Sequence, residues 1–269
     1  MLRVICYPSL EIKNCSAIYL HACALLPYSL AIVMSTPKIV TSSPKIIVHW
    51  LNQSRANYII WFLEELGLTY EVKVYERDKN MRAPEELKKI HPLGKSPVLE
   101  VDGEILAESG YMMSYLLKNY DKDYRLTPSS IALQNKVDYY LHYSEGSFHP
   151  PEVMLVVLNV TRKKLPFGIK FLGGKILDAI ADNYALPEVV THLNYLENNL
   201  EGQEYFCGDK LSAADIILSF PLRNSLKLLR NPERERKNYP NVLAWLDRIS
   251  KREGYKKAQE MDKEHPAKF

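Results

Sequence analysis

Residues 45–75 alternate between two hydrophobic patterns. Lys45–Trp50 is rich in β-branched residues, which is typical of a buried strand. Ala56–Leu66 spaces its apolar side chains at the helical period, and Gly67 follows in the position where helices commonly end. Tyr70–Tyr75 alternates apolar and polar side chains. The pattern predicts a strand, a helix and a second strand in that order.

The segment that follows predicts a second helix and a strand pair. Pro84–Ile90 is a short helical stretch with proline in its first turn. Asp102–Gly103 is a two-residue hairpin signal, so Pro97–Val101 and Glu104–Ala107 are expected to pair antiparallel. A further helix is expected over about Ser109–Tyr120.

The resulting order β-α-β-α-β-β-α predicts a thioredoxin-like domain with a mixed sheet over residues 45–122. Residues 123–130 are polar, and we interpret them as a linker. From residue 131 to residue 269 the segments have helical spacing, which predicts an all-helical second domain. The expected fold class is therefore α/β followed by all-α.

Proline and capping residues divide the helical half. Pro150–Pro151 is expected to kink or restart the chain. Ser212 and Asp215 have the spacing of a capping box, with Leu211 and Ile216 as the accompanying hydrophobic pair, so we expect a structural role. Loss of Asp215 should cost on the order of 1 kcal/mol or more through the cap. Helices are expected at Ile131–Glu145, Glu152–Lys164, Phe171–Tyr184, Pro187–Leu200, Ser212–Leu228 and Val242–Lys251, with Lys256–Phe269 as a polar tail.

Residues 1–44 do not fit either domain. Ala17–Met34 is mostly apolar and as a helix would reach about 27 Å, which is marginal for a bilayer core. One interpretation is a membrane tether. The other is that the extension is unstructured or absent, with translation beginning at Met34.

The composition narrows the class of protein. A net charge of +3 is too small to indicate nucleic-acid binding, and the charge run Arg230–Lys237 alternates in sign like a solvated loop. Three of the four cysteines lie in the first 23 residues, which leaves Cys207 in the predicted domains. This argues against a disulfide scaffold and suits a reducing compartment.

The stretch from His91 to Leu99 predicts a small-molecule site. It contains a proline-rich turn, and Pro97 opens a strand, where proline is tolerated as a first residue or as a cis peptide. A cis Ser96–Pro97 bond would turn the backbone groups of Ser96 toward a ligand. Glu108–Ser109 then lies at the start of a helix, where free N–H groups and the macrodipole favour an anion.

This order of turn, proline, hairpin and Glu108–Ser109 resembles the glutathione site of the soluble glutathione transferases. The resemblance extends from about Lys45 to the C-terminus. It is carried by the family's first helix at Ser54–Arg55 and Trp61–Leu68, by its capping motif at Leu211–Ile216, and by stretches most similar to ascomycete-yeast transferases at Ala83–Gly94 and Glu145–Ser147.

The resemblance implies an enzyme that conjugates the glutathione thiolate to hydrophobic electrophiles, with glutathione-dependent peroxide reduction as a second activity, in detoxification and stress response. It implies a homodimer in the cytoplasm, or alternatively at the endoplasmic reticulum membrane. Glutathione is the co-substrate, and neither a further cofactor nor a metal is expected. A non-catalytic glutathione-binding or regulatory protein with the same fold is the alternative.

Ser54 is the candidate catalytic residue. At about pH 7 only about 3% of a thiol with an ordinary pKa is thiolate, and lowering the pKa by about two units requires about 2.7 kcal/mol of differential stabilisation. A hydroxyl beside a helix N-terminus can supply it, and the resemblance implies this role for Ser54. The alternative is a plain N-cap.

The glutathione-binding candidates match the groups of the tripeptide. Glu108 can take the ammonium group, and Ser109 the adjacent carboxylate. Lys95 would meet the glycyl carboxylate as a point charge. Ser96, beside Pro97, would contribute its main chain to the cysteinyl part, so its side-chain identity should matter less.

Two weaker candidates are His91 and Arg55. His91 either approaches the carboxylate or caps its own loop. Arg55 serves the ligand, a subunit contact, or an ion pair to Glu64 or Asp215. Tyr58 occupies a position where relatives often have a second arginine, which puts anion recognition from this helix in doubt.

An aromatic cluster is the candidate electrophile pocket. Tyr139, His142, Tyr143 and Phe148 lie on or after the first helix of the second domain, where they could form an apolar wall between the domains. Alternatively, these side chains belong to the core or to a dimer contact.

Overall fold

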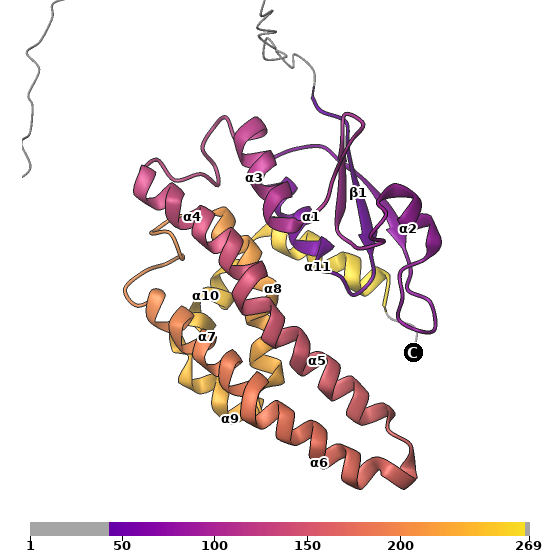
Figure 1. Ribbon diagram of the computed structural model, residues 1–269. Coiled ribbons are helices and arrows are strands. Elements are labelled where there is room, and N and C mark those ends of the chain that lie inside the picture. The colour runs from indigo at the N-terminus through magenta and orange to yellow at the C-terminus, as the bar shows by residue number, and fades with distance from the viewer. Residues whose placement is uncertain (1–42, 267–269) are drawn as a thin grey trace, which may run out of the picture. The chain divides into compact units, whose positions relative to one another are not determined.

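A computed structural model describes residues 43–266 of the chain, and its N-terminal half has the predicted element order (Figure 1). The helices and strands are β1 (Ile46–Leu51), α1 (Ala56–Leu66), β2 (Glu71–Tyr75), α2 (Glu85–Ile90), β3 (Val98–Val101), β4 (Glu104–Leu106) and α3 (Ser109–Tyr120). The predicted N-terminal extension, with its apolar run Ala17–Met34, lies almost entirely outside the described residues. Between residues 43 and 266 the structure contains no helix both long and apolar enough to cross a membrane.

The four strands form one mixed sheet in the order β2-β1-β3-β4. β1 pairs parallel with β2 and antiparallel with β3, and β3 pairs antiparallel with β4. The predicted mixed sheet with its edge hairpin is therefore confirmed. Every residue of the central strand β1 is buried, because helices cover the sheet on both faces (Figure 1).

The C-terminal half is helical, as predicted, but its helices join differently. The elements are α4 (Ile131–Tyr143), η1 (Ser144–Phe148), α5 (His149–Lys164), η2 (Phe167–Ile169), α6 (Lys170–Ile180), η3 (Ala181–Ala185), α7 (Leu186–Asn199), α8 (Ala213–Leu228), α9 (Pro232–Glu235), η4 (Arg236–Asn238), α10 (Pro240–Ser250) and α11 (Glu253–Glu264).

Two π-helical turns explain the difference. η1 joins α4 directly to α5, and η3 joins α6 directly to α7. The expected kink or restart at Pro150–Pro151 coincides with the junction of η1 and α5, where the prolines lie in the first turn of α5 and need no N–H donor. The expected loop Arg230–Lys237 instead contains the short helix α9.

The predicted polar tail from Lys256 is also wrong, because α11 packs along α1. The rings of Tyr255 and Trp61 meet edge to face with centroids 5.1 Å apart. Lys257 Nζ lies 2.6 Å from the Glu64 carboxylate. The helix has few apolar residues and is held by polar contacts as well as by apolar ones, so its sequence resembles a polar tail.

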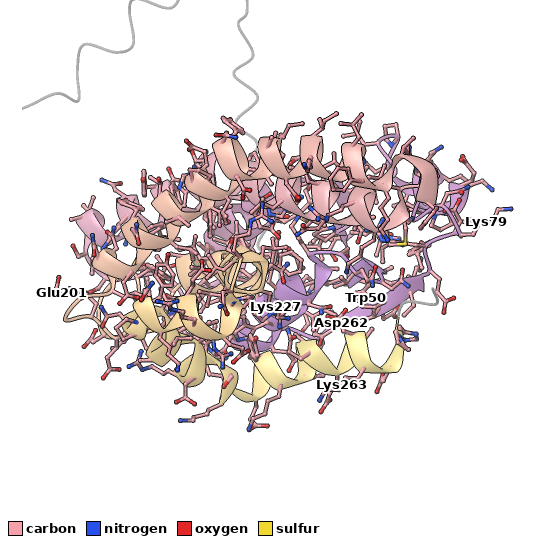
Figure 2. All side chains as sticks on the ribbon, turned by 90° about the horizontal axis from the view of Figure 1, so that it is seen from below. Trp50, Lys79, Glu201, Lys227, Asp262 and Lys263 are labelled. Carbon is pink, nitrogen blue, oxygen red and sulfur yellow. The ribbon has the colours of Figure 1, made fainter. Side chains whose placement is uncertain are left out.

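A partly buried chain of two hydrogen bonds fixes the end of α11 to the sheet. Trp50 Nε1 of β1 donates to Asn57 Oδ1 at 2.6 Å, and Asn57 Nδ2 donates to Asp262 Oδ2 at 2.6 Å. Figure 2 shows Asp262 between Trp50 and Lys227, which projects from α8. The C-terminal helix α11 therefore packs against the first domain, although it follows the second domain in the chain.

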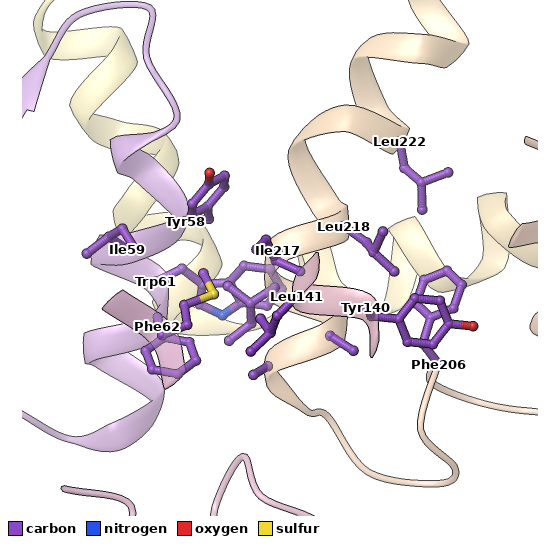
Figure 3. Close-up of a cluster of buried hydrophobic side chains, with 14 of the residues drawn as sticks. Tyr58, Ile59, Trp61, Phe62, Tyr140, Leu141, Phe206, Ile217, Leu218 and Leu222 are labelled. Atoms are coloured by element: carbon purple, nitrogen blue, oxygen red, sulfur yellow. The ribbon is translucent and has the colours of Figure 1, made fainter. Parts of the chain in front are cut away.

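The two domains share one hydrophobic core. Figure 3 shows α1, with Trp61 and Phe62, beside Leu141 of α4 and Ile217 of α8. These residues are fully or almost fully buried. The predicted cap of α8 lies in the turn before Ile217 and is formed by Ser212 and Asp215, which confirms the structural prediction.

Candidate functional site

The turn before β3 brings two serine hydroxyls together. The Ser96–Pro97 peptide bond is cis, one of the alternatives that the sequence left open. Ser96 Oγ donates to the His49 carbonyl at 3.1 Å and accepts from the Leu51 N–H at 3.2 Å. Ser54 Oγ lies 3.2 Å from Ser96 Oγ, and because the Ser96 proton is already used, Ser54 is the donor. The Ser96 side chain therefore links Ser54 to the backbone of β1.

Ser54 lies at the N-terminal end of α1. Its side chain is almost buried, at 7% exposure, and its Oγ accepts the N–H of Ala56, the first helical residue, at 3.2 Å. The cap position itself is held by Arg55, one residue later than the alternative N-cap interpretation requires. The hydroxyl is thus close to the positive end of the helix dipole.

Arg77 holds the loop that carries Ser54, a role that the sequence patterns did not reveal. Its Nε donates to the Asn52 carbonyl at 3.0 Å, and its two terminal nitrogens donate to the carbonyls of Met81 and Gln53. Asn52 Oδ1 accepts the Arg77 N–H at 2.9 Å in return. This guanidinium immobilises the connection between β1 and α1.

A polar groove of about 690 Å³ adjoins these residues. Its lining includes the cationic side chains of Arg77, Arg82, Lys88 and Lys95, together with Ser96. Four cations against two acids, from Asp78 and Glu85, make the groove suited to an anionic group. The structure therefore places Lys95 where a carboxylate would be attracted.

The backbone of His91 closes the turn that follows α2. Its N–H donates to the Leu87 carbonyl at 3.1 Å, and its carbonyl accepts from the Gly94 N–H at 2.9 Å. The ring Nδ1 is buried and makes no hydrogen bond within the part of the chain that the structure describes.

Glu108 and Ser109 present opposite environments at the start of α3. Glu108 has an exposed side chain and a positive φ of 67°, a conformation rarely adopted by residues other than glycine and often retained at functional sites. Ser109 is buried, and its Oγ accepts the Tyr58 hydroxyl proton at 2.7 Å. Glu108 is therefore free to meet a ligand while Ser109 is held by α1.

Polar side chains from both domains meet beside the start of α3. We call Arg55, Tyr58, Ser109 and Glu145 the interdomain polar cluster. Arg55 pairs with Glu145 of η1 rather than with Glu64 or Asp215, so both expected ion pairs are wrong. Tyr58 Oη lies 3.2 Å from Glu145 Oε1. Burial raises the pKa of Tyr58, and Glu145 raises that pKa further, so the hydroxyl stays a proton donor.

The site and the fold both match known proteins. The N-terminal domain model of glutathione S-transferases matches residues 43–118, and the C-terminal domain model of the same family matches residues 160–253. Glutathione S-transferase 1 of Saccharomyces cerevisiae is 39% identical over 222 residues, which cover 79% of this chain and 93% of that protein. The chain belongs to the glutathione S-transferase family.

Further relatives agree. Glutathione S-transferase 3 of Schizosaccharomyces pombe is 31% identical over 207 residues, covering 77% of this chain and 84% of that protein. A glutathione S-transferase structure from Actinobacillus pleuropneumoniae has a TM-score of 0.65 and 34% identity, covering 80% of this chain and 92% of that one. The chain is thus an enzyme with glutathione transferase function, and the resemblance read from the sequence is confirmed.

The aromatic wall expected for the second substrate of this transferase is not formed as predicted. Phe148 is fully buried and Tyr143 almost so, and both pack against the His192 ring of α7 with centroids 5.5 and 5.4 Å away. They belong to the core of the helical domain, which was the alternative interpretation. Helical spacing shows that such side chains lie on one helix, but not whether their face of the helix meets the core or the substrate pocket.

The other two aromatic candidates are exposed on α4. The Tyr139 ring stacks on Tyr143, and its hydroxyl accepts from Tyr195 at 3.1 Å. His142 Nδ1 lies 2.9 Å from the Asp138 carbonyl. These contacts tie both side chains to the helical domain.

Proposed function

We propose that this transferase conjugates glutathione to hydrophobic electrophiles, with Ser54 donating a hydrogen bond to the glutathione thiolate. The supporting observation is that the Ser54 proton is directed only at another neutral hydroxyl, 3.2 Å away on Ser96. A hydrogen bond to a thiolate is charge-assisted and stronger than a bond between neutral groups. An arriving thiolate therefore competes favourably for this proton.

Each of the remaining candidate residues binds a different group of the tripeptide. The exposed Glu108 carboxylate takes the ammonium group, and the Ser109 N–H and hydroxyl take the neighbouring carboxylate at the start of α3. The main chain of Ser96 takes the cysteinyl part. Lys95 draws the glycyl carboxylate into the cationic groove.

Tyr58 acts as a positioning residue for this recognition, because its hydroxyl orients the Ser109 Oγ. We expect Tyr58→Phe to raise the KM for glutathione about fivefold, the equivalent of one hydrogen bond of about 1 kcal/mol, and to leave kcat unchanged. Steady-state kinetics at saturating electrophile measure both constants. Tyr70→Phe is the matched control, since Tyr70 donates to Glu64 outside the cluster. An equal effect of the two variants would contradict the role.

One face of α5 is suited to the electrophile. The His149 and Phe220 rings have centroids 6.3 Å apart, and the Phe220 and Tyr58 rings have centroids 6.4 Å apart. Tyr58 belongs to the interdomain polar cluster. This face of the helix therefore begins beside the glutathione site. At helical spacing from His149 it continues with three exposed apolar side chains: Val153, Val156 and Val160.

The double variant Val156→Ser with Val160→Ser tests this surface. We expect it to lower kcat/KM by about tenfold or more for a long-chain alkyl electrophile, and much less for a short-chain one, because only the long chain reaches the valines. The KM for glutathione should not change. Met154→Ser is the control, because Met154 is exposed on another side of α5. Equal losses for short and long chains would contradict this placement.

A further inference from the structure

The turn between α5 and α6 exposes an apolar surface outside the residues assigned above to glutathione and the electrophile. Figure 1 shows the two helices running together beyond the rest of the second domain to a free turn. Near this turn Phe167 is 97% exposed, Phe171 77% and Leu172 67%. Contiguous apolar surface of this kind on a folded domain usually marks an interaction site. We call residues 162–176 the hairpin tip.

The solvent side of α6 continues this surface. Ile169, Leu172, Ile176 and Ile180 recur at helical spacing and are all exposed. Their side chains therefore form one apolar strip along the outside of α6. A surface helix would ordinarily be polar on this side.

Basic residues accompany the apolar ones. Between Val153 and Ala181 the sequence has five basic side chains and a single acid, Asp178. That acid is already paired with Arg162. The remaining basic residues are lysines: Lys163, Lys164, Lys170 and Lys175. One of them, Lys175, lies over the Phe171 ring with its Nζ 4.4 Å from the centroid.

We propose that the hairpin tip docks on an anionic lipid surface. Phenylalanine, leucine and isoleucine side chains enter the boundary between headgroups and acyl chains, and lysines beside them meet the lipid phosphates and carboxylates. The tip offers both kinds of group on one short segment. Docking would hold the transferase where hydrophobic electrophiles accumulate.

The charge distribution favours a lipid surface over a second copy of the chain. A two-fold contact between hairpin tips would bring the lysines of one copy against those of the other. The one local acid is occupied by Arg162, so it does not offset this repulsion. An anionic bilayer complements the same lysines without any such opposition.

Vesicle flotation of the full-length protein tests the proposal. Binding is expected to vesicles of phosphatidylcholine with phosphatidylserine, to be weaker to phosphatidylcholine alone, and to fall as salt is raised. The double variant Phe167→Ser with Phe171→Ser should lose on the order of tenfold in binding or more. Tyr124→Ser is the control, because Tyr124 is 68% exposed elsewhere on the surface. Residues 1–42 are the same in every variant, so a difference in vesicle binding between variants is due to the hairpin tip.

Conjugation of a water-soluble electrophile should be unchanged in the double variant, since neither phenylalanine touches the glutathione site. This keeps the proposal separate from that of Ser54. Equal vesicle binding by wild type and double variant would overturn it, as would no binding by either protein. A smaller oligomer for the double variant in sedimentation would also overturn it, by identifying the tip as a self-association surface.

Discussion

Replacing Ser54 by alanine is expected to lower kcat/KM for an aromatic halide up to about 50-fold at about pH 6.5, and hardly at all at about pH 9.5. If the hydroxyl lowers the glutathione pKa from about 8.5 to about 6.5, half of the bound thiol is thiolate at the lower pH in the wild type and about 1% in the variant. Above both values the thiol is ionised in either protein. The effect must therefore shrink as pH rises.

The measurement is the pH profile of kcat/KM together with the ultraviolet absorbance of the bound thiolate. The apparent pKa of the bound thiol, obtained from either measurement, should rise by the same amount in Ser54→Ala, while glutathione still binds. Ser54→Thr is the matched control, because threonine keeps the hydroxyl. Since Ser54 Oγ also accepts the Ala56 N–H, the alanine variant should lose about 1 kcal/mol of stability, which is too little to unfold the protein. A variant that keeps its rate at low pH would show that another group activates the thiol.

Local sequence patterns predict the first domain well because the signals that define its helices and strands lie within a few neighbouring residues. The strand run of β1, the helical period of Ala56–Leu66 and the Asp102–Gly103 hairpin each depend on neighbouring residues alone. The structure has α1 with the predicted bounds and the hairpin in the predicted pairing. In the site, the placement of Pro97 allowed either a plain strand-opening proline or a cis bond, and the structure has the cis bond.

Contacts between distant segments were not predictable in the same way. Arg55 and Glu145 lie 90 positions apart, and only the packing of α1 against η1 brings them together. α11 was missed because a few apolar residues and several charged ones hold it, including Lys257 against Glu64. Tyr143 was assigned to a pocket because the helical period says nothing about which neighbour its face meets.

The capping residue Asp215 should be far more important for stability than its helix position suggests. The structure gives its fully buried carboxylate four hydrogen bonds, from the Ser212 N–H and hydroxyl, the Phe206 N–H and Trp245 Nε1, at 2.8–3.0 Å. The last two reach beyond the cap, so they join α8 to the preceding loop and to α10. The cost estimated from the cap alone is therefore too low.

We expect Asp215→Ala to lower the free energy of unfolding by at least about 3 kcal/mol, because each buried donor left without an acceptor costs about 1–3 kcal/mol. Urea unfolding at equilibrium measures the change. Asp215→Asn keeps one of the two acceptor oxygens, so its stability should fall between those of the wild type and Asp215→Ala. This variant gives a measurable change even if the alanine variant does not fold. Asp209→Ala is the control, since this nearby acid is exposed and should change stability by less than about 0.5 kcal/mol. Equal stability of the Asp215 and Asp209 variants would mean that solvent, rather than this carboxylate, satisfies the donors in α8, α10 and the loop between α7 and α8.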